Sequence, residues 1–491
     1  MRSAGSLVRV RPEELLLIGL TGVLVVAGLT LGGEGRLAYI ALSIPIVVGL
    51  SWWRPLYGFA ALLGLVLLVE EFEILTMASG QPFLLELVPL YRSIEGFTSL
   101  PIALTPLELW LTLLGAFWVA QRIARDRLEF AHVPCVGPWL AAVGTLAVTF
   151  ALGVARGGDL SAAIAEVRAP AYLLALIWFV PQLIESRRDI ELLVGVMIVV
   201  LGIKAVQGLY RYVFLLHMHL DLRDTFMAHE DPVMFIPMLF LLFAVLHYGG
   251  APVLRRALLI ATPFMFVALV LTQRRTAYVT VSICAVFFAI ELAPAARRAF
   301  VRYVLPVVVV LAAYVVVLGG SSSPLARPIN RALQLFDPYN TSNLYRVVEL
   351  DNLRYTVLEK PWGSGFGHPY QMVRGLPEID FPLVEYIPHN EIMWIWVKAG
   401  TLGFILVMFF FARLVAESTW TYRHLRDPLF RAVATIIGLA IVNQLIVSYY
   451  DLQLTYARPM FYLGTLAGLL GPLREQSGLL RRPTGARWRL F

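Results

Sequence analysis

The sequence has 491 residues, of which 59% are hydrophobic and 15% charged, and its mean hydropathy is +0.74. No polar stretch is long enough to form a separate soluble domain, so we expect a polytopic membrane protein. The net charge of +7 could suggest nucleic acid, but the basic residues form short clusters beside apolar runs, a pattern that sets membrane topology. We therefore expect no nucleic-acid partner.

Apolar runs close to the ~20 residues needed to cross a hydrocarbon core recur along the chain. They lack strand-like alternation, and a spanning segment must satisfy its own backbone hydrogen bonds, so helices are expected and not a barrel. The predicted fold class is an all-α integral membrane protein with about fourteen transmembrane helices, within a range of about twelve to fourteen. The runs are 14–32, 37–53, 56–70, 105–121, 138–154, 170–184, 190–216, 231–248, 256–272, 276–293, 301–319, 390–412, 430–448 and 456–472.

One pair of cations breaks the expected charge bias. If both termini are cytoplasmic, alternation puts the other basic clusters inside, as the positive-inside rule expects, but places Arg274 and Arg275 of "TQRRTAYV" on the outer side. Their turn is too short to carry charge for solubility, so we interpret the pair as functional. The alternatives are a miscounted helix and side chains that reach lipid headgroups.

The polar segment 320–389 falls outside by the same alternation and divides the chain into helices 1–319, this loop, and C-terminal helices with a cytoplasmic tail, 390–491. A loop of this length is usually functional or disordered, and its aromatic residues argue against disorder. The stretch "LYRVVELDNLRYTVLEK" predicts an amphipathic helix near the outer membrane surface. Pro361 ends it, and the glycines of "PWGSGFG" permit a tight turn, whose amides could also approach phosphate.

His389 of "PHNEIMW" stands where the loop enters the next helix. A neutral imidazole is the usual proton acceptor near neutral pH, although His389 with Asn390 could instead cap the helix. Lys398 points away from His389 by helical phase and is assigned no role.

Basic residues also occur inside the run 190–216. Lys204, Gln207 and Arg211 share one helix face, and buried cations usually face a cavity, a partner or a substrate. Arg211 lies near the outer end and, with Arg346 of the loop, completes a possible set of outward cations. Ion pairs with Asp221, Asp224 or Glu230 are the alternative, favoured for Lys204.

No metal site is predicted. The outer turn "HMHLDLRDTFMAHEDP" carries His217, His219, His229, Glu230 and Asp231, but their spacing matches no zinc pattern, and the acidic group Glu70, Glu71 and Glu73 fits a solvated helix end better than a cation site. Cys135 and Cys284 fall in different environments, which argues against a disulfide.

The combination resembles the O-antigen ligase and O-antigen polymerase superfamily of bacterial envelope glycosyltransferases, over roughly residues 230–415. Three pieces carry the resemblance: "TQRRTAYV", with Arg275 the better match, "NLYRVVELDNLRYTVLEKPWGSGFG", and "PHNEIMWIWVKAGTLG". The chain departs from the family in its number of apparent spans, in Lys398 and in "HEDPVMF". The site residues concerned are Arg274, Arg275, Arg211, Arg346, His389, Gly363, Gly365 and Gly367.

The resemblance implies a GT-C-like membrane enzyme that needs no cofactor and no metal. Its donor would be a glycan on polyprenyl (undecaprenyl) pyrophosphate, its acceptor a glycan or lipid A-core hydroxyl on the periplasmic side of the bacterial inner membrane. The arginines would bind the pyrophosphate, and His389 would act as general base in an inverting transfer. The alternatives are a polymerase of the same superfamily and a transporter or flippase, although the repeated halves typical of transporters are absent from the sequence.

Overall fold

The computed structural model describes residues 36–71, 90–96, 103–125, 129–218, 226–319, 321, 323, 326–334, 337, 339–377 and 383–480. Within these ranges the chain folds into helices, turns and bends, and no strand occurs. The predicted all-α class is confirmed there. Every predicted apolar run is helical except 14–32, which lies outside the described residues.

The chain divides into two compact units, Met1–Leu128 with Arg487–Phe491, and Glu129–Ala486. In the first unit α5 begins at a capping box, because the Thr105 hydroxyl accepts from the Glu108 N–H and the Glu108 carboxylate accepts from the Thr105 N–H. The described elements of this unit are α2 (Arg36–Trp53), α3 (Pro55–Leu68), the 3₁₀ turn η2 (Ile94–Gly96) and α5 (Pro106–Ala124).

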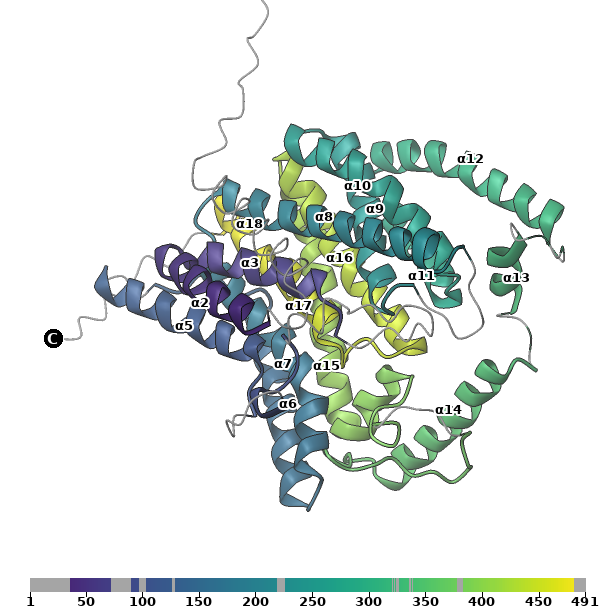
Figure 1. Ribbon diagram of the computed structural model, residues 1–491, viewed down its shortest axis with the longest axis horizontal. Helices are drawn as coiled ribbons and strands as arrows, with labels where there is room; N and C mark the ends of the chain where they lie inside the picture. Colours follow the sequence, from purple (N-terminus) through teal and green to yellow (C-terminus); the bar gives the residue numbers. More distant parts are fainter. Residues whose placement is uncertain are drawn as a thin grey trace, which may run out of the picture. The chain divides into compact units, whose positions relative to one another are not determined.

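The second unit holds every other described helix (Figure 1). They are α6 (Val136–Ala155), α7 (Leu160–Leu183), α8 (Arg187–Tyr210), the π-helical turn η3 (Arg211–Leu215), α9 (Asp231–Tyr248), α10 (Pro252–Leu271), α11 (Arg275–Glu291), α12 (Pro294–Leu318), α13 (Arg327–Leu333), α14 (Thr341–Glu359), α15 (Glu391–His424), α16 (Pro428–Tyr450), α17 (Ala457–Gly468) and α18 (Leu470–Gln476).

Among the described helices, 8 are long and apolar enough to cross a membrane: α6, α7, α8 with η3, α9, α10, α12, α15 and α16. The predicted run 276–293 forms α11, of 17 residues, and the run 456–472 forms α17, of 12 residues, followed by the short α18. A helix rises 1.5 Å per residue, so α17 is only about 18 Å long. The expectation of about fourteen spans is therefore not reached in the described chain, and the exact number stays a prediction.

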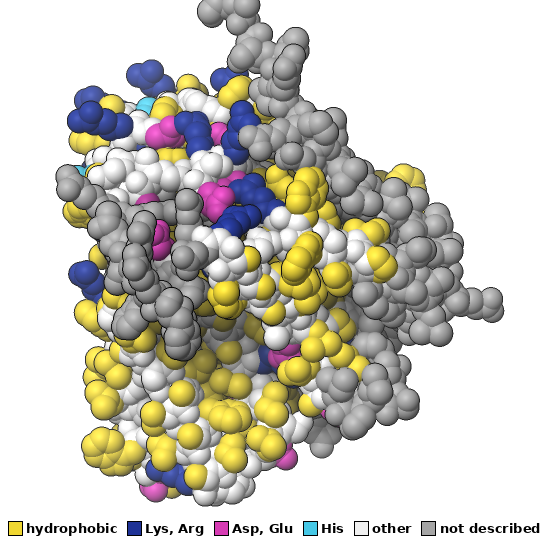
Figure 2. Space-filling view, turned by 90° about the vertical axis from the view of Figure 1, so that its left-hand side faces the viewer, with side chains coloured by type: hydrophobic (Ala, Val, Ile, Leu, Met, Phe, Trp, Pro, Cys, Tyr) yellow, Lys and Arg dark blue, Asp and Glu magenta, His cyan; other side chains and the backbone are white. Residues whose placement is uncertain are grey.

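The second unit is organised around α16. This helix packs against α9, α11 and α15, and 78% of its apolar window is buried. In contrast, none of the corresponding window of α12 is buried inside the unit, and its Val316 and Val317 are 83% and 76% exposed. Hydrophobic side chains are also spread widely over the face drawn in Figure 2. Exposed apolar helix faces are what a bilayer covers.

The helix α15 is interrupted at Gly400, which the sequence did not predict. Gly400 has φ 70° and ψ 178°, a conformation that favours glycine and breaks the helix into two parts. The part before Gly400 lies beside α14 (Figure 1), where Leu353 and Val357 of α14 pack against Val397. The described part of segment 320–389 is thus folded onto the helical unit, with α14 formed as the amphipathic pattern predicted.

Candidate active site

His389 is held by Glu349 of α14. The Glu349 carboxylate accepts a hydrogen bond from ring Nδ1 at 3.1 Å and from the backbone N–H of His389 at 3.1 Å, and it is 1% exposed. Because an ionised carboxylate only accepts hydrogen bonds, Nδ1 must carry the proton, which leaves Nε2 as the basic nitrogen. The Tyr345 ring meets the imidazole edge-on, with centroids 5.2 Å apart, and further fixes its orientation.

The start of α15 is fixed independently of this histidine. Asn390 caps the helix, since its Oδ1 accepts from the Met393 N–H at 3.0 Å. Capping is therefore the role of Asn390, while the imidazole of His389 binds Glu349. The buried Glu391 accepts hydrogen bonds from the backbone N–H groups of Gln453, Leu454 and Thr455 and from the Thr455 hydroxyl, which ties the turn after α16 to the beginning of α15.

The turn after α16 also carries Asp451, whose carboxylate lies near the basic side chains of Arg274 and His229. Its Oδ2 lies 3.6 Å from Nη1 of Arg274 and 3.9 Å from Nδ1 of His229. Burial alone would raise the pKa of Asp451, but the basic groups His229, Arg274, Arg346 and His389 bring it below its ordinary value. Arg274 and His389, far apart in sequence, thus act on one carboxylate at one end of the bundle.

The neighbouring Arg275 faces elsewhere. Its Nη1 donates to the carbonyl of Gln334 at 3.1 Å, to Oδ1 of Asn343 at 3.0 Å and, at 3.4 Å, to Oδ1 of Asn340. These acceptors lie between α13 and the first turn of α14, so Arg275 anchors the outer segment to the start of α11. The two adjacent arginines, expected to act together, therefore make different described contacts.

The remaining predicted cations also differ. Arg346 of α14 donates from Nη1 to the Ser342 hydroxyl at 3.0 Å, while its Nε is buried without a hydrogen-bond partner among the described residues. Arg211 begins η3, is 8% exposed and is not among the groups that act on Asp451. Arg346 is thus one of the basic groups that act on Asp451, and the binding role expected for Arg211 stays a prediction. Lys204 is buried and donates to the side chain of Gln207 at 3.2 Å.

The same unit also contains a fully buried group of three charged side chains. The guanidinium of Arg458, at the start of α17, contacts Glu230 and Asp231 at 2.7 Å each. Both acids are therefore ion-pair partners of Arg458. Among the residues that the structure describes, which leave out His219 and Glu73, no group of three His, Cys, Asp or Glu side chains could hold a metal ion. Cys135 and Cys284 are both free.

The glycine turn after α14 docks on α6, α7 and α15. Gly363, Gly365 and Gly367 have φ between 78° and 86°, and a Cβ on Gly365 would lie 2.5 Å from Cα of Gly153. The backbone N–H groups of the turn are already bonded, for example that of Gly365 to the Lys398 carbonyl at 3.0 Å and that of Gly367 to Glu166 at 2.6 Å. The turn is therefore a close-packed structural element whose bonded amides do not form a phosphate cradle.

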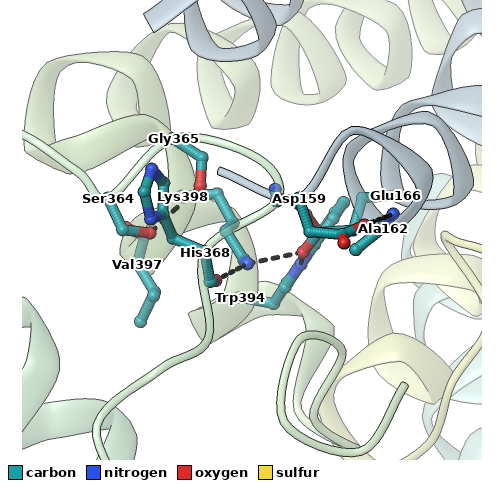
Figure 3. A network of polar contacts seen from close by, with 10 residues as sticks. Asp159, Ala162, Glu166, Ser364, Gly365, His368, Trp394, Val397 and Lys398 are labelled. Atoms are coloured by element: carbon teal, nitrogen blue, oxygen red, sulfur yellow. Dashed lines mark hydrogen bonds and ion pairs between the residues drawn. The ribbon is translucent and has the colours of Figure 1, made fainter. Parts of the chain in front are cut away.

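Lys398, to which the sequence assigned no role, lies under this turn. Its Nζ is 2.6 Å from the buried Glu166 of α7 and also donates to the carbonyl of His368 (Figure 3). Glu166 in turn accepts from Nε1 of Trp394 at 3.1 Å. The pair joins α7, α15 and the glycine turn, and it does not touch His389, as the helical phase predicted.

Next to this pair an apolar pocket opens between α6, α7 and α15. It contains about 590 Å³ of empty space, part of it open to the outside. Leu146, Leu173 and Phe410 line its depth, and Trp394 and Leu454 line it from the two segments that also carry His389 and Asp451. A hydrocarbon chain in the pocket would therefore lie close to the polar site.

Residues 260–408 match the family model described as O-Antigen ligase. The superfamily expected from the sequence is confirmed over this segment. No curated protein matches the chain. The O-antigen ligase segment includes Arg274, Arg275, Arg346, Glu349 and His389. For this reason a glycan-transfer function in a membrane is what the match supports.

Glu349 and Asp451 were not predicted from the sequence. Glu349 follows Arg346 by one helical turn within the O-antigen ligase segment, and its place on the inward face of the α14 stripe could have singled it out. Asp451 lies outside that segment, directly after the run 430–448. The only sequence signal for Asp451 is the alternation of the apolar runs, which puts the end of the run 430–448 on the same side of the membrane as His389.

Proposed function

We propose that the protein transfers a glycan from a polyprenyl pyrophosphate to an acceptor hydroxyl on the periplasmic side of the bacterial inner membrane, as an O-antigen ligase-like glycosyltransferase. One arrangement carries the proposal. The imidazole of His389 has the buried Glu349 behind it, Arg274 contacts Asp451, and the hydrogen bonds of Glu391 with residues 453–455 tie the segments that carry His389 and Asp451 together. A base and a cluster of cations are what this transfer requires.

The reaction is a single displacement. The acceptor oxygen attacks the anomeric carbon, the bond from that carbon to the pyrophosphate oxygen breaks, and the pyrophosphate leaves with the bonding electrons. His389 takes the hydroxyl proton at Nε2, the nitrogen that Glu349 leaves unprotonated. Attack opposite the leaving group inverts the anomeric centre.

The arginines stabilise the leaving group. Negative charge grows on the pyrophosphate as the bond breaks, and guanidinium groups held at fixed positions lower the energy of that charge. Arg274, which contacts Asp451, and Arg346 would supply these guanidinium groups, and Arg275 would contribute by fixing the segment that bears Arg346. The apolar pocket beside Trp394 offers an apolar contact surface to part of the lipid chain, which would help to keep the pyrophosphate at the membrane boundary.

The test compares wild-type protein with His389→Ala in the presence of a polyprenyl-pyrophosphate-linked glycan, with and without a lipid A-core acceptor, and follows product length on a gel. His424→Ala is the matched control, because His424 lies at the other end of α15 and binds the carbonyl of Trp420. Product that requires the acceptor and His389 supports the ligase. Longer chains from donor alone identify a polymerase, and no His389-dependent product with any donor removes the enzyme proposal and favours a transporter.

A further inference from the structure

Asp451 places a negative charge where a pyrophosphate clamp should be positive. Its carboxylate is 13% exposed and lies 3.6 Å from Arg274, itself 17% exposed. Asp451 follows the last residue of α16, and its Oδ1 accepts from the N–H of Leu452 at 3.0 Å, which holds the side chain in place. The site is therefore built with an anion already in contact with its cations.

The neighbouring buried acids are in contact with other basic side chains. Glu230 and Asp231 have Arg458, and Glu349 has His389, so each of these carboxylates has its own basic partner. Asp451 is the acid that Arg274 contacts at the open end of the site. An arginine paired with a carboxylate binds a second anion less strongly, because the two anions repel each other and share one cation.

We propose that Asp451 is an internal anion that holds Arg274 in place while the site is empty, gives way to the pyrophosphate of the donor, and returns to Arg274 when the lipid pyrophosphate leaves. The proposal rests on the proposed function. It makes Asp451 a positioning residue that limits the affinity of the clamp.

Such a residue favours product release. The released pyrophosphate monoester has one more ionisable oxygen than the donor diester, so an arginine cluster without a competing anion binds the product more strongly than the donor. Asp451 opposes this tight binding. Replacing it by Asn should then strengthen pyrophosphate binding and lower kcat and KM together, whereas loss of a structural contact alone would lower kcat and raise KM or leave it unchanged.

The experiment measures binding of inorganic pyrophosphate to the purified full chain by calorimetry. Asp451→Asn keeps the size of the side chain and an oxygen for the Leu452 N–H, so the turn after α16 is preserved. We expect about tenfold tighter binding, which corresponds to ~1.4 kcal/mol. The control is Asp351→Asn, which removes an equal charge from a carboxylate paired with Arg354 and Arg374 on the outer face of α14.

Equal or weaker binding by Asp451→Asn overturns the proposal. Equal tightening in both variants also overturns it, because the effect would then be one of net charge. If wild type and variant both fail to bind pyrophosphate, the internal-anion role is excluded, and the glycan-transfer assay decides separately whether the proposed function survives.

A measurement on wild-type protein guards against a variant that does not fold. With ¹³C-carboxyl-labelled aspartate, the infrared difference spectrum between pyrophosphate-bound and free protein should show a shifted carboxylate band, since Asp451 exchanges its guanidinium partner. An unchanged carboxylate region on pyrophosphate binding overturns the proposal.

Discussion

One carboxylate, Glu349, binds both the main chain and the ring of His389, at 3.1 Å in each case. Glu349, a side chain of α14, thereby fixes both the position of His389 and which of its ring nitrogens carries the proton. Glu349→Gln removes the charge that stabilises a protonated imidazole. We expect kcat to fall at least about 10-fold, a part of the 10²- to 10⁴-fold that a positioned general base typically contributes.

The control for this variant is Glu359→Gln, at the exposed end of the same helix. Steady-state kinetics with saturating donor would measure both variants. Unchanged kcat in Glu349→Gln, with normal folding, would exclude an orienting role for this carboxylate.

Replacing Arg274 or Arg275 by alanine should lower glycan transfer for different reasons. Arg274→Ala removes a group that faces Asp451, so we expect kcat/KM for the donor to drop roughly 10- to 100-fold, equivalent to ~1.5–3 kcal/mol, while the fold persists. Arg275→Ala should also lower transfer, but by releasing the segment that begins α14. Limited proteolysis near 334–343 separates the two cases, since only Arg275→Ala should increase cleavage there. Identical cleavage patterns would contradict this division of roles.

Gly365→Ala should prevent the glycine turn from docking. A left-handed φ costs a residue with a side chain about 1–3 kcal/mol, and the added Cβ would also meet the backbone of Gly153 at 2.5 Å. Thermal unfolding in detergent should show a clear loss of stability. Gly375→Ala is the matched control, because nothing lies within 4 Å of the Cβ it would add.

Lys398→Met should destabilise the protein without touching the site chemistry. It leaves Glu166 buried next to a neutral side chain, and breaking a buried ion pair from one side costs about 3–5 kcal/mol. The double variant Lys398→Met with Glu166→Gln should recover part of this loss, because no uncompensated charge remains. A double-mutant cycle on unfolding measures the coupling. Additive effects of the two substitutions would show that the pair contributes little.

The helices could be predicted from the sequence because long apolar runs and residues at helical spacing indicate helices whether their apolar side chains pack inside the protein or face lipid. The stretch 344–358 lies within α14, and His389 stands immediately before Asn390, the capping residue of α15, as expected. The partners could not be predicted. Glu349 precedes His389 by forty positions, and Asp451 follows it by more than sixty, so only the packing of α14, α15 and α16 shows that they meet.

The break at Gly400 was missed for a related reason. The stretch 390–412 is mostly apolar, and apolarity does not distinguish a continuous helix from one interrupted to receive another backbone. The Gly363 turn lies against Gly400 so closely that a Cβ on Gly400 would approach the Trp362 carbonyl carbon to 2.4 Å. Two glycines remote in sequence are needed at one crossing, which a pattern along one segment does not reveal.

The hydrogen bonds of Glu391 join two segments of the candidate site. Its carboxylate holds the amides of residues 453–455, and it stands two positions after His389 while the segment it holds begins two positions after Asp451. The segments that carry His389 and Asp451 are therefore held together by the hydrogen bonds of Glu391. In the transfer reaction proposed above, removal of the hydroxyl proton and departure of the lipid pyrophosphate are therefore expected to be coupled, because Glu391 holds both segments.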